Sequence, residues 1–135
     1  DRAIRTAEDL GRLIRDQRWR CFVPSEVETL ALVARYHRKT PPRSAHRAFA
    51  RLNPLDQSRV STLAALLRVA DALDRRHIQV VRDVHAALDD KRLTVRIDAP
   101  QAVTVEMDAG RRKSDLLRKL TGRVVAFEWT GPPAA

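Results

Sequence analysis

The sequence predicts a mainly helical protein, in which a helical bundle is followed by a small α+β unit of strand, strand, helix and strand. Apolar residues recur at spacings of three and four up to about residue 88, as on one face of a helix. Beyond that point they alternate with polar residues, as in strands. We therefore expect a helical domain over 1–88, an α+β unit over 89–129 and a disordered tail over 130–135.

Four helices are expected in the first domain, over the approximate ranges 2–17, 25–38, 44–52 and 55–75. The second helix begins with the capping-box pattern Ser25-x-x-Glu28 behind Pro24. Pro41-Pro42 ends it, because proline cannot continue a helix. Capping then accounts for Ser25, which needs no role as a nucleophile.

Two further expectations concern burial in this domain. Trp19 and Phe22 form an apolar knot between the first two helices, and Cys21 is packed with them. The longest helix contacts the core through regularly spaced apolar residues. These are Val60, Leu63, Leu66, Leu67, Ala70 and Leu73.

In the C-terminal unit we expect two strands, at 93–97 and 103–107. A helix at 111–120 and a last strand at 124–129 follow them. A turn with Pro100 joins the two strands, and Gly122 ends the helix. The segment 77–84 fits either a strand or a continuation of the preceding helix, and the pattern does not separate the two.

The charge indicates an anionic partner. The 135 residues carry a formal net charge of +9, and lysine supplies only four of the 26 basic side chains. Arginine suits two-point contacts with phosphate, so polyphosphate, nucleotides and nucleic acid all fit this charge. The alternative is an arginine-rich composition with no such role, because the charge is spread along the chain.

Cysteine usage and hydropathy favour a cytoplasmic location. Cys21, the single cysteine, cannot form an internal disulfide, as expected in a reducing compartment. No apolar run is long enough to span a membrane, and no signal peptide is expected at the start. Because the chain opens on Asp1, we expect a fragment or a processed product.

Two stretches resemble a known family. They are EVETLALVARYHRK at 26–39, followed by Pro41-Pro42, and LAALLRVADALDRRH at 63–77. Together with the C-terminal pattern they resemble the C-terminal region of the exopolyphosphatase/guanosine-pentaphosphate phosphatase family, over about 24–129. The resemblance implies an HD-domain-like bundle, dimerisation and a polyphosphate path. It also implies a hydrolase whose catalytic, actin-like domain is not in this chain.

The resemblance also implies a degenerate metal site. TAEDLGRLI at 6–14 is similar to the HD-domain stretch that holds a His-Asp pair, with Glu8 in place of the histidine. The metal candidates for Mg²⁺ or Mn²⁺ are Glu8, Asp9, His37 and Asp71.

Helical spacing places His37 inside the apolar arc of its helix, and Asp71 and Asp74 lean inward on theirs. One interpretation is a remnant metal or phosphate site. The other is a set of hydrogen-bonded structural groups, paired with residues such as Arg38 or Arg68. The remaining histidines show no ligand spacing and are expected on the surface or in loops. These are His46, His77 and His85.

Two basic clusters are candidates for phosphate binding. The first joins the end of one helix to a stripe on the next, and consists of Arg35, Arg38, Lys39, Arg43, Arg47 and Arg51. The second, Arg111-Arg112-Lys113, is expected at a helix N-terminus, where a bound anion would offset the unfavourable dipole. A solvated helix face is the alternative for the first cluster.

These observations favour a polyphosphate-binding and dimerisation module that is not itself catalytic. A stand-alone HD-type phosphohydrolase that acts on polyphosphate or guanosine polyphosphates is an alternative, and it requires metal-dependent turnover. A basic nucleic-acid-binding module is a third hypothesis and is favoured less, since the sequence has no recognised motif and few aromatic residues for stacking.

Overall fold

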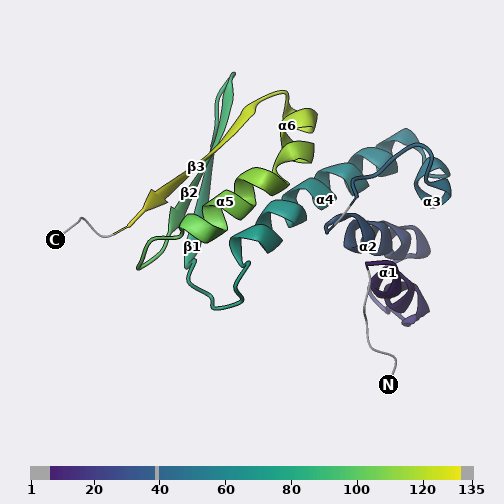
Figure 1. Ribbon diagram of the computed structural model, residues 1–135. Helices are drawn as coiled ribbons and strands as arrows, with labels where there is room; N and C mark the ends of the chain where they lie inside the picture. Colours follow the sequence, from purple (N-terminus) through teal and green to yellow (C-terminus); the bar gives the residue numbers. More distant parts are fainter. Residues whose placement is uncertain (1–6, 39, 132–135) are drawn as a thin grey trace. The chain divides into compact units, whose positions relative to one another are not determined.

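The computed structural model describes residues 7–38 and 40–131, with the side chains of 7 and 8 excepted. These residues form six helices and three strands (Figure 1). The coarse fold class, helices together with a small α+β unit, is confirmed. The chain divides into two compact units between residues 67 and 68, within helix α4 (Pro54–Leu73), whereas the sequence pattern predicts a division at residue 88.

Helices α1 (Ala7–Asp16) and α2 (Pro24–Tyr36) pack together in the first unit. Gly11 makes this close approach possible, because a Cβ atom there would lie 3.1 Å from the carbonyl oxygen of Ala31. The short helix α3 (Arg47–Ala50) and the first part of α4 complete the unit. The predicted helix over 2–17 is confirmed for 7–16, while 2–6 lie outside the described residues.

The start of α2 differs from the predicted capping box. Val23 is the N-cap residue, and its backbone N–H donates to the Glu26 carboxylate over 3.0 Å. Ser25 lies inside the helix, so its predicted capping role is wrong. Glu28 is one turn further on and faces α1 instead. Pro24 at the first helical position already suits a helix start, which moves the cap one residue before it.

The buried face of α4 is also different from the expected one. Val60 and Leu73 are buried as predicted, whereas Leu63, Leu66 and Leu67 are 39–50% exposed. Ala70 is exposed as well. Small residues take much of the buried face instead: Ala64, Ala65 and Ala72. Apolar residues of α4 lie on most sides of the helix, so their spacing alone did not identify the buried side.

The second unit is a three-stranded sheet with order β1-β2-β3. Strands β1 (Asp83–Leu88) and β2 (Arg92–Asp98) form an antiparallel hairpin, in which Asp83 pairs with Asp98. Strand β3 (Val124–Thr130) lies parallel to β2, with Arg92 opposite Val124. A parallel neighbour needs a crossover, which helices α5 (Thr104–Lys113) and α6 (Asp115–Thr121) provide (Figure 1).

The predicted strand 103–107 is wrong, because these residues begin α5. Its alternation over five residues was too short to exclude a helix, and the buried positions Glu106, Ala109 and Gly110 follow helical spacing. Gly110 lies against β3, since a Cβ atom there would be 2.9 Å from the Phe127 ring. Tertiary packing thus overrides the strand propensity of the valines and threonine at 103–105.

Other boundaries follow from local chemistry. The predicted helix 111–120 divides at Ser114 between α5 and α6. Gly122 ends α6 at a left-handed φ of 63°, as predicted, and the last strand is confirmed. The segment 77–84, left open by the sequence, contributes only the start of β1. The helix expected over 44–52 is limited to α3, and 132–135 of the expected tail lie outside the described residues.

Glu106 is the most deeply buried charged group of the second unit, with 1% of its side chain exposed. Arg76 holds it through two hydrogen bonds, Nε to Oε1 at 2.7 Å and Nη2 to Oε2 at 3.2 Å. These bonds lower the pKa of the Glu106 carboxyl below its ordinary value, and the charge stays paired inside the unit.

Candidate phosphate-binding site

The arginines of the predicted basic patch lie in the first unit, but those at 43–51 do not share one helix as expected. Arg47 alone is within α3, with Arg43 before it and Arg51 at its C-cap, so the proposed stripe along one continuous helix is wrong. All three side chains are exposed, as is that of Arg38. Lys39 lies outside the described residues.

A more concentrated group of cations lies between α1 and α2. A hollow of about 290 Å³ is lined by Gly11, Arg12, Arg15 and Arg35. We call this hollow the arginine notch. Arg35 was predicted from the sequence, whereas Arg12 and Arg15 were missed. Only the α1–α2 contact at Gly11 shows that arginines from both helices line one hollow.

Arg15 has a double role in the notch. Its Nε and Nη2 atoms each donate to Glu28 over 2.8 Å, which joins α1 to α2. Its Nη1 atom lies on the side of Gly11, 3.7 Å from the position of a Cβ there. A guanidinium has five N–H donors in a plane, so binding Glu28 leaves the Nη1 edge directed to the notch.

The three arginines of the notch outnumber the one carboxylate that Arg15 binds there. The hydrogen bonds from Arg15 lower the pKa of the Glu28 carboxyl, so this group is ionised at neutral pH. One carboxylate and three guanidinium groups give these four residues a net charge of +2. Such a site attracts a group that carries more than one negative charge, such as phosphate.

Aromatic contacts gather at the end of α2. The Tyr36 hydroxyl lies 2.9 Å from Nδ1 of His46, and the two rings stack with centroids 5.4 Å apart. Burial raises the pKa of the Tyr36 hydroxyl, which stays neutral. The Arg35 guanidinium lies 5.4 Å from the centre of the Tyr36 ring, a cation–π contact that orients it. His46, expected on the surface or in a loop, lies in the loop just before α3 and is half-buried.

Of the metal candidates, Asp9, His37 and Asp71 have described side chains, and they are divided between the two units. His37 is buried as expected, and its Nδ1 donates to the Ala34 carbonyl over 2.6 Å. Asp71 is half-buried and belongs to the second unit, and the Glu8 side chain lies outside the described residues. Within the described ranges, no three His, Cys, Asp or Glu residues are grouped to hold a metal ion.

Two further expectations for charged residues are wrong. Asp74, expected to face inward, is exposed beside His77. Arg111, Arg112 and Lys113 lie in the last turn of α5, where the helix dipole favours cations without any bound anion. The second cluster therefore lies at the wrong end of a helix for the predicted anion site.

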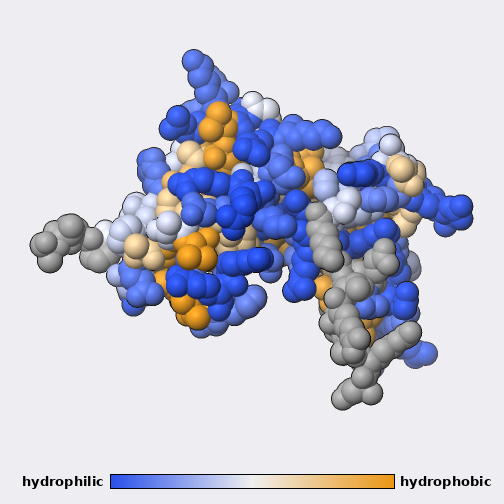
Figure 2. Space-filling view, viewed as in Figure 1, coloured by the Kyte–Doolittle hydropathy of each residue, from blue (hydrophilic) through white to orange (hydrophobic). Residues whose placement is uncertain are grey.

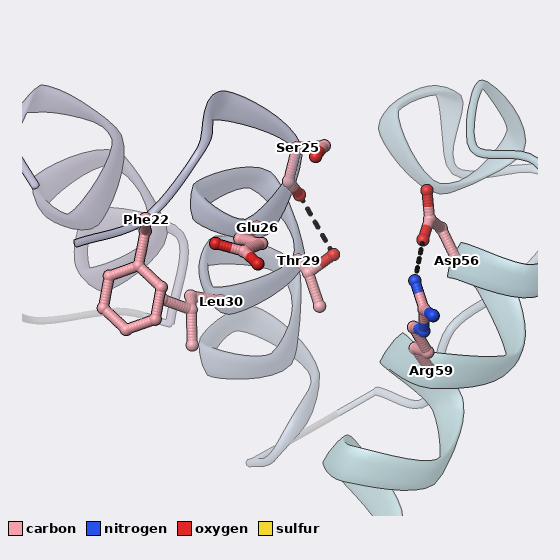
Figure 3. Close-up of a pocket in the computed structure, with 7 residues that line it drawn as sticks. All are labelled: Phe22, Ser25, Glu26, Thr29, Leu30, Asp56 and Arg59. Carbon is pink, nitrogen blue, oxygen red and sulfur yellow. Dashed lines mark hydrogen bonds and ion pairs between the residues drawn. The ribbon is translucent and has the colours of Figure 1, made fainter.

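A second hollow in the first unit lies between α2 and the start of α4 (Figure 3). Its polar side chains already have structural partners: Thr29 donates to the Ser25 carbonyl, Asp56 pairs with Arg59, and Glu26 caps α2. Its lining contains no histidine or cysteine that could activate a nucleophile. This hollow is therefore a weak candidate for catalysis.

Comparison with known proteins leaves the family open: no protein-family model matches the sequence, and no curated protein matches it. Hydrophilic residues dominate the face shown in Figure 2, with smaller hydrophobic areas between them. None of the helices in the described part of the chain has the length and apolar character needed to cross a membrane.

Proposed function

We propose that this chain is a polyphosphate-binding and dimerisation module of an exopolyphosphatase-related protein, with an HD-like helical bundle and no catalytic activity of its own. The observation that carries the proposal is the arginine notch. Arg12, Arg15 and Arg35 converge there on a hollow with room for phosphate. Exposed arginines elsewhere in the first unit extend the positive surface for a chain of phosphates. They are Arg38, Arg43, Arg47 and Arg51.

The chemistry of polyphosphate fits this surface. Each phosphate presents oxygens that accept the parallel N–H groups of a guanidinium, so arginine gives directed contacts in addition to charge. Affinity for such a polymer arises from ion pairing, and it falls steeply as salt rises. Binding without hydrolysis requires neither a metal nor a nucleophile.

The test is a titration of the purified chain with long-chain polyphosphate at two salt concentrations. The double variant Arg12→Ala/Arg35→Ala removes two cations of the notch. Arg111→Ala/Arg112→Ala removes the same charge from α5 and serves as the matched control. We expect the notch variant alone to weaken binding, and to reduce the slope of log K against log salt by about 1 for each arginine.

Three results would contradict the proposal. Equal effects of the two double variants would show that only total charge matters. Phosphate release on addition of Mg²⁺ or Mn²⁺ would favour an HD-type phosphohydrolase. Displacement of polyphosphate by duplex DNA at low concentration would favour a nucleic-acid surface. Circular dichroism of each variant establishes that its helices are retained.

A further inference from the structure

An exposed aromatic pair follows α1, in contrast to the packed knot predicted from the sequence. Trp19 and Phe22 are 40% and 41% exposed, and their rings meet edge to face with centroids 6.1 Å apart. The indole Nε1 of Trp19 donates to the Ile14 carbonyl over 2.7 Å, which fixes the orientation of the ring. Cys21 between them is exposed as well, so its predicted packing is wrong.

The surroundings of this pair are cationic. Arg18 and Arg20 flank Trp19 in the chain, and both side chains are exposed. A hollow of about 420 Å³ is lined by Trp19 and Phe22, together with Arg15 and the Glu28 carboxylate that Arg15 binds. We call it the aromatic hollow.

Arg15 also lines the arginine notch. The aromatic hollow and the notch therefore adjoin each other at Arg15.

We propose that the aromatic hollow binds a nucleobase of single-stranded nucleic acid, with the neighbouring phosphates held in the arginine notch. Proteins that bind single-stranded nucleic acid combine exposed aromatic rings with arginines, because every base has a face that can stack on a ring. Inorganic polyphosphate has no such face, and a duplex hides its bases. An apolar protein partner would have to bury Arg18 and Arg20 without a counter-charge, which is unfavourable.

This inference uses the notch as its phosphate subsite and in that respect rests on the proposed function. The aromatic hollow makes a separate prediction, since its effect should depend on bases and not on charge. The variant Trp129→Phe leaves Trp19 as the only tryptophan, so that fluorescence reports on this ring alone.

The experiment titrates the Trp129→Phe chain with a single-stranded oligonucleotide of about 12 nucleotides, within the usual site sizes for such proteins. An abasic oligonucleotide of equal length, the duplex and a free nucleoside triphosphate are the comparisons. We expect Trp19 quenching by the oligonucleotide, and affinity about tenfold above that for the abasic strand. Protection of Cys21 from alkylation by the oligonucleotide gives a second readout.

The variants separate stacking from charge. The two variants at position 19 lack the Trp19 fluorophore, so protection of Cys21 is their readout. Trp19→Ala should lose the preference for bases and retain polyphosphate binding, and Trp19→Phe should retain much of the preference because the ring can still stack. Arg12→Ala/Arg35→Ala should weaken the binding of both polyphosphate and the oligonucleotide.

Equal affinity for the abasic and base-bearing strands would overturn the inference. So would a free nucleotide that binds as tightly as the oligonucleotide. If the oligonucleotide binds with base preference while polyphosphate does not bind, the proposed function fails and this inference stands.

Discussion

Arg15 and Glu28 join helices α1 and α2 through two parallel hydrogen bonds, each 2.8 Å long. Glu28 was expected to cap its own helix, and the pairing gives it a tertiary role instead. The same guanidinium borders the arginine notch and the aromatic hollow. One ion pair therefore contributes to the fold and also positions the candidate binding surface.

Glu28→Gln should destabilise the first unit by about 0.5–1 kcal/mol at pH 7, a modest value because both side chains are over a third exposed and screened by solvent. The folded-state pKa of Glu28 is lowered, so its stabilisation is present above the ordinary value of 4.5 and is lost as pH falls through the folded value. Urea unfolding monitored by Trp19, in the Trp129→Phe background, measures both effects.

Asp16→Asn is the control for this change, since it removes an exposed carboxylate from the end of α1. It should alter stability little at either pH. A difference between Glu28→Gln and the parent chain that stays constant from pH 7 to below pH 4 would contradict the assigned role of the ion pair.

Gly11→Val should separate α1 from α2. Even the Cβ atom would lie 3.1 Å from the Ala31 carbonyl oxygen, and the branched side chain adds further bulk. We expect a loss of about 1–3 kcal/mol, typical of overpacking, together with weaker polyphosphate binding. Leu13→Val introduces the same residue on the exposed side of α1 and is the control. Equal stability of the two variants would show that the close approach at Gly11 is unimportant.

Arg76→Ala should destabilise the second unit, because it leaves the buried Glu106 carboxylate without its partner. In the parent chain the lowered pKa of Glu106 makes its contribution present above the ordinary value of 4.5 and lost in acid. The difference between parent and variant should therefore be largest near pH 7 and should shrink as pH falls. Fluorescence of Trp129 in the Trp19→Phe background reports the unfolding of this unit.

A double-mutant cycle completes this test. Glu106→Leu removes the charge that Arg76→Ala leaves unpaired, so the double variant should be more stable than Arg76→Ala alone. Strictly additive losses would indicate that the two side chains act independently, in contradiction to the two hydrogen bonds between them.

Much of the fold could be predicted from the sequence where one pattern persisted over many residues. Helices α1, α2 and α4 and strands β2 and β3 lie close to their expected positions. The failures have a common origin in tertiary packing. The residues at 103–107 alternate like a strand but pack as a helix, because Gly110 allows α5 to approach Phe127. Leu63 and Ala64 lie side by side on α4, and local spacing could not tell which one is buried.

The candidate site was predictable only in part. A high arginine content and the position of Arg35 were visible in the sequence. That Arg12 and Arg15 share a hollow with Arg35 depends on the angle and depth of α1–α2 packing, to which a single glycine contributes. Exposure of Trp19 and Phe22 could not be inferred either, because aromatic residues in a connection are commonly buried.

Gly110→Ala and Gly122→Ala should both destabilise the second unit, for different reasons. At Gly110 the new methyl group would lie 2.9 Å from the Phe127 ring, so we expect a loss of about 1–3 kcal/mol from overpacking. At Gly122 no atom lies within 4 Å, but φ is +63°, and the left-handed backbone costs alanine about 1–2 kcal/mol.

Phe127→Leu distinguishes the two causes, since the smaller side chain makes room beside position 110 and changes nothing near 122. It should recover stability in the Gly110→Ala background and only add its own loss in the Gly122→Ala background. Urea unfolding of the three single variants and the two double variants provides the comparison. Recovery in both backgrounds, or in neither, would show that contact with the Phe127 ring is not what requires glycine at position 110.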